Sequence, residues 1–130
     1  MTGYPLTALA TLLVLLVYAA LSAAVSRARG KYGVTAPAVT GNPDFERRYR
    51  VQVNTLEQMP LILPLMWLCA VTVGDPWAAL GGLVWSVGRI IYARGYYAEA
   101  AKRETGFIVG AVPVVAMFGA VIVAIAWHWA

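Results

Sequence analysis

The sequence predicts an all-α integral membrane protein, a bundle of four transmembrane helices. Three observations support this fold class. Hydrophobic residues make up 61% of the 130 residues and charged residues only 12%, and the mean hydropathy is +0.69. One small soluble core cannot bury that much apolar surface. Four apolar stretches, separated by short polar or proline-containing segments, fill residues 1–130 as a single domain.

The first span is expected over residues 4–29. Residues 1–26 carry no charged side chain, and the segment PLTALATLLVLLVYAALSAAV supplies the roughly 20 residues that cross a hydrocarbon core. A cleavable signal peptide is the competing interpretation. It is disfavoured because the segment lacks a basic start and leads into further apolar sequence.

The second span is expected over residues 44–73. Asn42 is a suitable N-cap, Pro43 suits the first helical position, and Asp44 places an acid in the first turn. The segment Gly-Asp-Pro at 74–76 marks the end of this helix, and its proline can open the next one.

The third and fourth spans are expected over residues 76–104 and 105–129. From Thr105 onwards His128 is the only titratable side chain. Because tryptophans flank His128 and no second ligand accompanies it, we interpret this histidine as part of an interfacial aromatic belt. No metal site is predicted.

The placement of basic residues predicts the orientation of the chain. They gather around the first and third connections, whereas the second connection offers only Asp75. By the positive-inside rule, the first and third connections face the cytoplasm and both termini lie on the non-cytoplasmic side. The net charge of +4 then reflects membrane topology, and no nucleic-acid partner is expected.

A polar stripe follows the second span. Arg50, Asn54 and Glu57 are spaced i, i+4, i+7 and therefore share one helix face, while Gln52 points elsewhere. Charged groups at this depth are costly in lipid unless protein, water or a ligand covers them. We therefore expect an oligomer that buries the second helix.

A second stripe is expected on the third span. Its members are spaced three, four, three and four residues apart, and they are Arg89, Tyr92, Tyr96, Glu99 and Arg103. If the two stripes meet, arginines outnumber glutamates, and an anionic ligand would complete the site. The alternative is that these charges pair internally or extend to headgroups and anionic lipid. Geometry alone leaves both readings open.

Two segments resemble a known family. FERRYRVQVNTLEQMPLILPLMWL, followed by GRIIYARGYYAEAAKR, is similar to the MAPEG family, the membrane-associated proteins in eicosanoid and glutathione metabolism. The pattern is most similar to the leukotriene C4 synthase and microsomal glutathione transferase branch. The resemblance implies a homotrimer in membrane lipid, with glutathione as co-substrate between neighbouring subunits near the cytoplasmic side. It also implies a lipophilic small-molecule substrate that enters from the bilayer.

The resemblance also implies which residues bind glutathione. The family's contacts fall on Arg29, Arg50, Gln52, Asn54, Glu57, Tyr92, Tyr96 and Arg103. Gln58 stands where the leukotriene C4 synthase pattern has a tyrosine, so an amide replaces one aromatic contact. Arg103 is the expected catalytic residue, because a guanidinium near the sulfur stabilises the thiolate. Arg29 would assist from the adjoining subunit, although Gly30 lacks the second arginine of that pattern.

The expected function is a glutathione transferase with a role in detoxification, acting by conjugation or by peroxide reduction. Two alternatives belong to other classes. One is a non-enzymatic lipid-binding scaffold of the same fold, whose pattern lacks the residues that here are Arg50 and Glu57. The other is a small proton-coupled multidrug transporter, which needs a lone acid rather than a net positive cluster.

Overall fold

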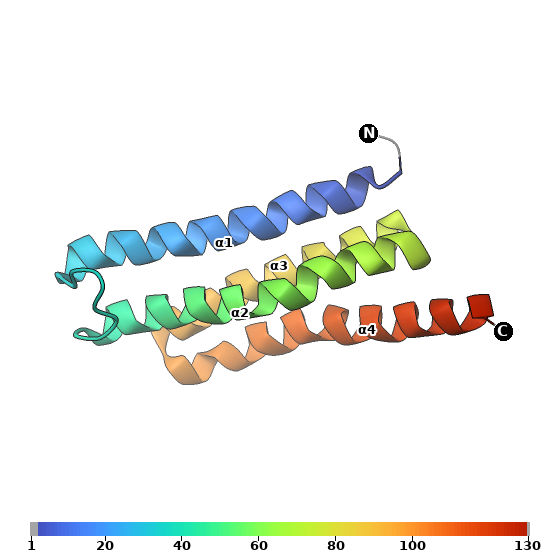
Figure 1. Ribbon diagram of the computed structural model, residues 1–130. Helices are drawn as coiled ribbons and strands as arrows, with labels where there is room; N and C mark the ends of the chain where they lie inside the picture. Colours follow the sequence, from blue (N-terminus) through green and yellow to red (C-terminus); the bar gives the residue numbers. More distant parts are fainter. Residues whose placement is uncertain (1–2, 130) are drawn as a thin grey trace.

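The computed structural model describes residues 3–129. It is all-helical over this range, as predicted: α1 (Pro5–Tyr32), α2 (Pro43–Thr72), α3 (Asp75–Ala98), the short 3-10 helix η1 (Ala100–Arg103) and α4 (Glu104–Trp129). The four α-helices lie side by side in an elongated bundle (Figure 1). The α1–α2 connection and the turn from α3 into α4 lie at one end. The α2–α3 turn and both chain termini lie at the other.

Three segments are long and apolar enough to cross a membrane: Pro5–Tyr32, Pro43–Thr72 and Ala100–Trp129. Among the described residues, α3 does not belong to this group by composition, although its 24 residues extend about 36 Å at 1.5 Å per residue. A membrane crossing by α3 therefore stays a prediction.

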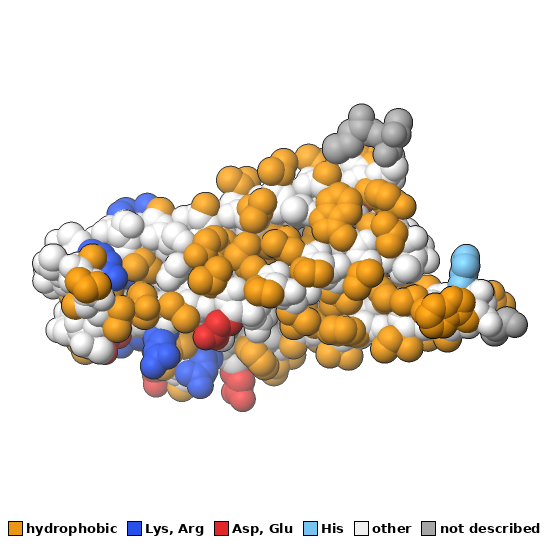
Figure 2. Space-filling view, viewed as in Figure 1, with side chains coloured by type: hydrophobic (Ala, Val, Ile, Leu, Met, Phe, Trp, Pro, Cys, Tyr) orange, Lys and Arg blue, Asp and Glu red, His pale blue; other side chains and the backbone are white. Residues whose placement is uncertain are grey.

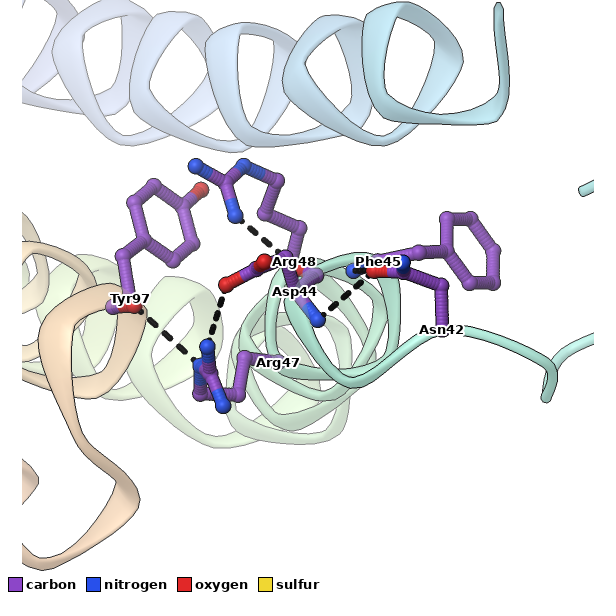
Figure 3. A network of polar contacts seen from close by, with 6 residues as sticks. All are labelled: Asn42, Asp44, Phe45, Arg47, Arg48 and Tyr97. Atoms are coloured by element: carbon purple, nitrogen blue, oxygen red, sulfur yellow. Dashed lines mark hydrogen bonds and ion pairs between the residues drawn. The ribbon is translucent and has the colours of Figure 1, made fainter. Parts of the chain in front are cut away.

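The predicted start of the second helix is confirmed to within one residue. The Asn42 side chain accepts hydrogen bonds from the backbone N–H groups of Asp44 (2.9 Å) and Phe45 (3.1 Å). Figure 3 shows Arg47 between the Asp44 carboxylate, with which it forms an ion pair, and the Tyr97 carbonyl oxygen, to which its Nε donates at 3.2 Å. These contacts join the first turn of α2 to the last turn of α3.

The predicted end of the third helix is wrong. We expected it to run to residue 104, but α3 ends at Ala98, Glu99 is extended, and the chain reverses through η1. The reversal brings the carbonyl oxygen of Lys102 against Gly95, where a Cβ atom would overlap it. The absence of a side chain at Gly95 therefore permits the turn that ends the helix.

Helices α3 and α4 approach each other closely at glycines. A Cβ on Gly88 would meet the backbone of Gly110, and one on Gly106 would overlap the backbone of Tyr92. Such close contact between helices is typical of membrane bundles with small residues at the interface. It holds the start of α4 directly against the part of α3 that carries the tyrosines.

Candidate functional site

The first predicted polar stripe and part of the second meet in space. One open cavity of about 380 Å³ lies between α2, α3, η1 and the first turns of α4. It is lined by Arg50, Val53, Asn54, Glu57, Tyr92, Tyr96, Arg103 and Phe107. Six of these eight residues are predicted site residues. The volume lies within the range usual for sites that bind small molecules.

Helix α2 contributes the cavity's charged wall. Arg50, Asn54 and Glu57 follow the helical repeat on one face, whereas Val51 and Thr55 between them are fully buried in the bundle. Because the buried face is held by packing, the direction of the polar face is set. Arg50 and Glu57 are exposed at the cavity's open side.

Helix α3 and η1 contribute the opposite wall. The rings of Tyr92 and Tyr96 lie with centroids 5.6 Å apart, and the guanidinium carbon of Arg103 lies 5.5 Å from the centroid of Tyr96. A cation–π contact of this kind attracts the guanidinium toward the ring face. Arg103 thus reaches the cavity through the chain reversal rather than by lying on the face of α3, as we had expected.

Glu99 does not lie where the stripe pattern predicted. It follows the end of α3, and its carboxylate forms an exposed ion pair with Lys102 at 3.7 Å. It does not line the cavity. The reason is the extended backbone at this position, which takes the residue off the helical repeat.

Two predicted site residues lie elsewhere in the single chain. The Nη1 atom of Arg29 donates to the carbonyl oxygen of Ala38 at 2.7 Å, and its guanidinium packs over Phe45 at 4.9 Å. The Nε2 atom of Gln52 donates to the hydroxyl of Tyr18 on α1 at 3.0 Å. The Arg29 side chain therefore contacts the α1–α2 connection and the first turn of α2, whereas the Gln52 side chain faces α1, and neither lines the cavity.

Gln58 also lies outside the cavity. It accepts a hydrogen bond from the indole N–H of Trp85 at 3.3 Å. Arg89, which we had expected to face the site, instead packs inside the bundle behind it. Its Nη2 donates to Asn54 Oδ1 and to Thr55 Oγ1, both at 2.9 Å.

Two lining residues were absent from the sequence-based set. Val53 and Phe107 are apolar and carry no signal that separates them from residues facing lipid. Phe107 lines the cavity only because α4 begins beside the tyrosines, which is a consequence of the contact between Gly106 and Tyr92.

The cavity suits a zwitterionic ligand with an excess of carboxylates. Two guanidiniums, of Arg50 and Arg103, outnumber the single carboxylate of Glu57. Arginine binds carboxylates through paired charge-assisted hydrogen bonds, and a carboxylate suits an ammonium group. Within residues 3–129 no group of three or more histidine, cysteine, aspartate or glutamate side chains is placed to hold a metal ion.

A comparison with family models decides the relationship of this chain. The model of the MAPEG family matches residues 7–123, which include every residue that lines the cavity. The chain belongs to the MAPEG family. The resemblance seen in the sequence is thereby confirmed, and it places the chain among membrane proteins.

Individual relatives of this MAPEG protein include one bacterial and several mammalian proteins. An uncharacterized protein of Synechocystis sp. is 48% identical over 95% of this chain and 87% of its own length. Human microsomal glutathione S-transferase 2 is 45% identical over 64% of this chain and 56% of its own length. Bovine leukotriene C4 synthase is 42% identical over 75% of this chain and 65% of its own length. The match with these two mammalian relatives spans less than two thirds of their length.

Proposed function

We propose that this MAPEG protein is a glutathione-dependent membrane transferase. It converts the glutathione thiol into a thiolate and adds it to a lipophilic electrophile, or uses it to reduce a lipid hydroperoxide. One observation carries the proposal: two arginines, a glutamate, an asparagine and two tyrosines converge on one cavity. The similarity to human microsomal glutathione S-transferase 2 supports it.

The polar groups of glutathione match those of the cavity. The tripeptide has two carboxylates, one ammonium group, two amides and a thiol. In the proposed complex Arg50 binds a carboxylate, Glu57 binds the ammonium group, and Asn54 with the tyrosines binds the peptide. One carboxylate and the ammonium group of the ligand then each have an opposite charge beside them.

Arg103 is the proposed catalytic residue. A guanidinium beside the sulfur favours the thiolate over the thiol, whose ordinary pKa is about 8.5, so the proton leaves to solvent. The sulfur then forms a bond to the electrophilic carbon. An aryl halide releases its halide as the anion, whereas an unsaturated aldehyde loses its C=C π bond and its α carbon takes a proton from water. With a hydroperoxide, the thiolate attacks the terminal oxygen, the O–O bond breaks, and glutathione sulfenic acid forms while the released alkoxide takes a proton from water to give the alcohol. A second glutathione then reduces the sulfenic acid to a disulfide and water.

The lipophilic substrate has a proposed place beside the polar cavity. A smaller cavity of about 190 Å³ shares Phe107 with it and is otherwise mostly apolar. Its lining includes the apolar residues Leu61, Val114 and Val115, and it also includes the polar residues Gln58 and Arg89. An electrophile that enters from the bilayer and packs here would bring its reactive carbon next to Phe107, at the edge of the thiol site.

A homotrimer is the proposed assembly. Arg50 and Glu57 are exposed on a membrane helix, and such charges need cover from protein, water or a ligand. In the trimer, Arg29 of one copy faces the cavity of the next, as the family resemblance implies. Measurement of the mass of the detergent-solubilised protein tests this arrangement, and a monomer would contradict it.

Four spans are proposed, with both termini on the non-cytoplasmic side and the site toward the cytoplasm. On the visible face, charged side chains gather toward the end of the bundle that holds the α1–α2 connection, while hydrophobic side chains cover much of the remaining length (Figure 2). Basic residues favour the cytoplasmic side.

The decisive experiment is an assay of the purified protein with glutathione. Calorimetry measures glutathione binding, ultraviolet absorbance measures thiolate formation, and three co-substrates test the chemistry: an aryl halide, an unsaturated aldehyde and a lipid hydroperoxide. Binding with thiolate formation and turnover of one co-substrate supports the proposal. Absence of glutathione binding would overturn it and favour the lipid-binding scaffold.

A further inference from the structure

Arg89 is a buried cation to which the proposed reaction assigns no step. Its side chain is 1% exposed in the middle of α3, and its Nε atom is buried without a hydrogen-bond partner among residues 3–129. Neither of the two ion pairs in this part of the chain involves Arg89. An unpaired charge inside a membrane bundle carries a large free-energy cost, so its presence there points to a role.

The contacts of Arg89 place it directly behind the polar cavity. Its Nη2 atom donates to the Asn54 side-chain oxygen and to the Thr55 hydroxyl, both at 2.9 Å. The guanidinium carbon lies 4.0 Å from the centroid of the Tyr92 ring. Asn54 and Tyr92 line the polar cavity, whereas Thr55 does not, and Arg89 lines only the smaller cavity beside it.

These contacts determine which end of the Asn54 amide is available to a ligand. A guanidinium has donors only, so the atom of Asn54 that it contacts must be the oxygen. The amide oxygen is thereby engaged toward the bundle interior, and the NH2 group is left to face the cavity. An amide that rotates freely would present either a donor or an acceptor there.

We propose that Arg89 is a positioning residue that holds the Asn54 amide with its NH2 group toward the ligand. Through Asn54 it makes the cavity select a ligand with a carbonyl or carboxylate oxygen at that point. This inference rests on the proposed function, in which the ligand is glutathione. The Tyr92 ring packs against the guanidinium and holds it in place by a cation–π contact.

The alternative is that Arg89 has only a structural role and stabilises the contact between α3 and α2. The same guanidinium donates to Thr55, which is fully buried and does not line the cavity. Thr55→Val removes this second bond and leaves Asn54 untouched. The Thr55→Val variant is therefore the matched control for the loss of a hydrogen bond that affects only the stability of the protein.

The test is a double-mutant cycle on glutathione affinity, measured by calorimetry on the purified protein. Arg89→Met is expected to weaken glutathione binding roughly 5- to 30-fold, the effect of losing one oriented hydrogen bond. In the Asn54→Ala background the same change is expected to alter the affinity less than about two-fold, because the group that Arg89 orients is gone. Thr55→Val is expected to leave the affinity within about two-fold.

Two further variants keep the proposal open to refutation if Arg89→Met does not fold. Arg89→Lys retains a donor-only cation and is expected to keep most of the affinity. Asn54→Asp gives the buried guanidinium a carboxylate partner, so the protein is expected to melt at a higher temperature, yet the residue no longer offers an N–H group and glutathione binds more weakly.

The outcomes separate the two proposals. Wild-type protein that binds no glutathione overturns the proposed function and this inference together. If wild-type protein binds, equal losses from Arg89→Met in both backgrounds overturn the role of Arg89 alone. Unchanged affinity in Asn54→Asp, or a loss in Thr55→Val as large as that in Arg89→Met, does the same.

Discussion

The carboxylate of Asp75, at the start of α3, caps the N-terminus of α1 through Thr7. Asp75 Oδ1 accepts hydrogen bonds from the backbone N–H of Thr7 at 2.7 Å and from its hydroxyl at 2.6 Å, while Oδ2 accepts from the N–H of Leu6 at 3.0 Å. The residue before α1, Tyr4, provides no side-chain cap. An acid 68 residues away in sequence therefore satisfies backbone donors that a helix start leaves free.

The first prediction concerns this cap. Asp75→Asn is expected to lower the free energy of unfolding by about 1–2 kcal/mol, because an amide accepts fewer bonds and its NH2 group opposes the N–H donors. Thermal unfolding in detergent measures the change. Glu99→Gln, which removes the same charge from an exposed pair, is the control and is expected to stay within about 0.5 kcal/mol. Equal shifts in both variants would contradict a capping role.

The second prediction concerns the contact between α4 and α3. Gly106→Ala is expected to destabilise the protein by about 1–3 kcal/mol and to weaken glutathione binding, because the new Cβ atom overlaps the backbone of Tyr92. Gly119→Ala in the same helix is the matched control, since nothing lies within 4 Å of its Cβ position. This control is expected to be neutral or to stabilise by up to about 1 kcal/mol. A stable Gly106→Ala protein with unchanged affinity would argue against the close approach.

The third prediction concerns thiolate formation. Arg103→Ala is expected to retain the trimer and glutathione binding but to lose the thiolate absorbance, with a fall in kcat/KM of roughly 10²–10³-fold. The neighbouring Lys102→Ala removes another exposed positive charge, one outside the cavity, and is expected to leave the absorbance unchanged. A persistent thiolate signal in Arg103→Ala would assign the activation of sulfur to another residue.

The fourth prediction concerns recognition of the ammonium group. Glu57→Gln is expected to raise the glutathione Kd roughly 10- to 100-fold, because a charge-assisted contact is replaced by a neutral one. Calorimetry measures the affinity. Glu46→Gln removes the same charge elsewhere on α2, outside the cavity lining, and its Kd is expected to match that of the wild-type protein. If both variants bind equally well, the ammonium group lies elsewhere.

The helical periodicity of α2 was sufficient to predict that the three polar cavity residues of this helix share one face. Arg50, Asn54 and Glu57 obey a repeat that continues without interruption through the helix, so their common face followed from spacing alone. The same reasoning failed beyond Ala98, since the end of α3 depends on contact between Gly95 and Lys102 rather than on a local proline. Arg103 lines the cavity, but from η1 rather than from α3, where we had expected it.

By itself the sequence determined the all-helical class and, to within a few residues, the bounds of α1, α2 and α4. It also identified the polar residues that cannot face lipid. These features follow from the sequence because apolar length and periodicity are local properties of the chain. Only the tertiary structure decided that Arg89 turns to Asn54 instead of the cavity, and that Asp75 caps α1. Both contacts join distant segments, and a guanidinium or a carboxylate takes the partners that packing brings within hydrogen-bond distance.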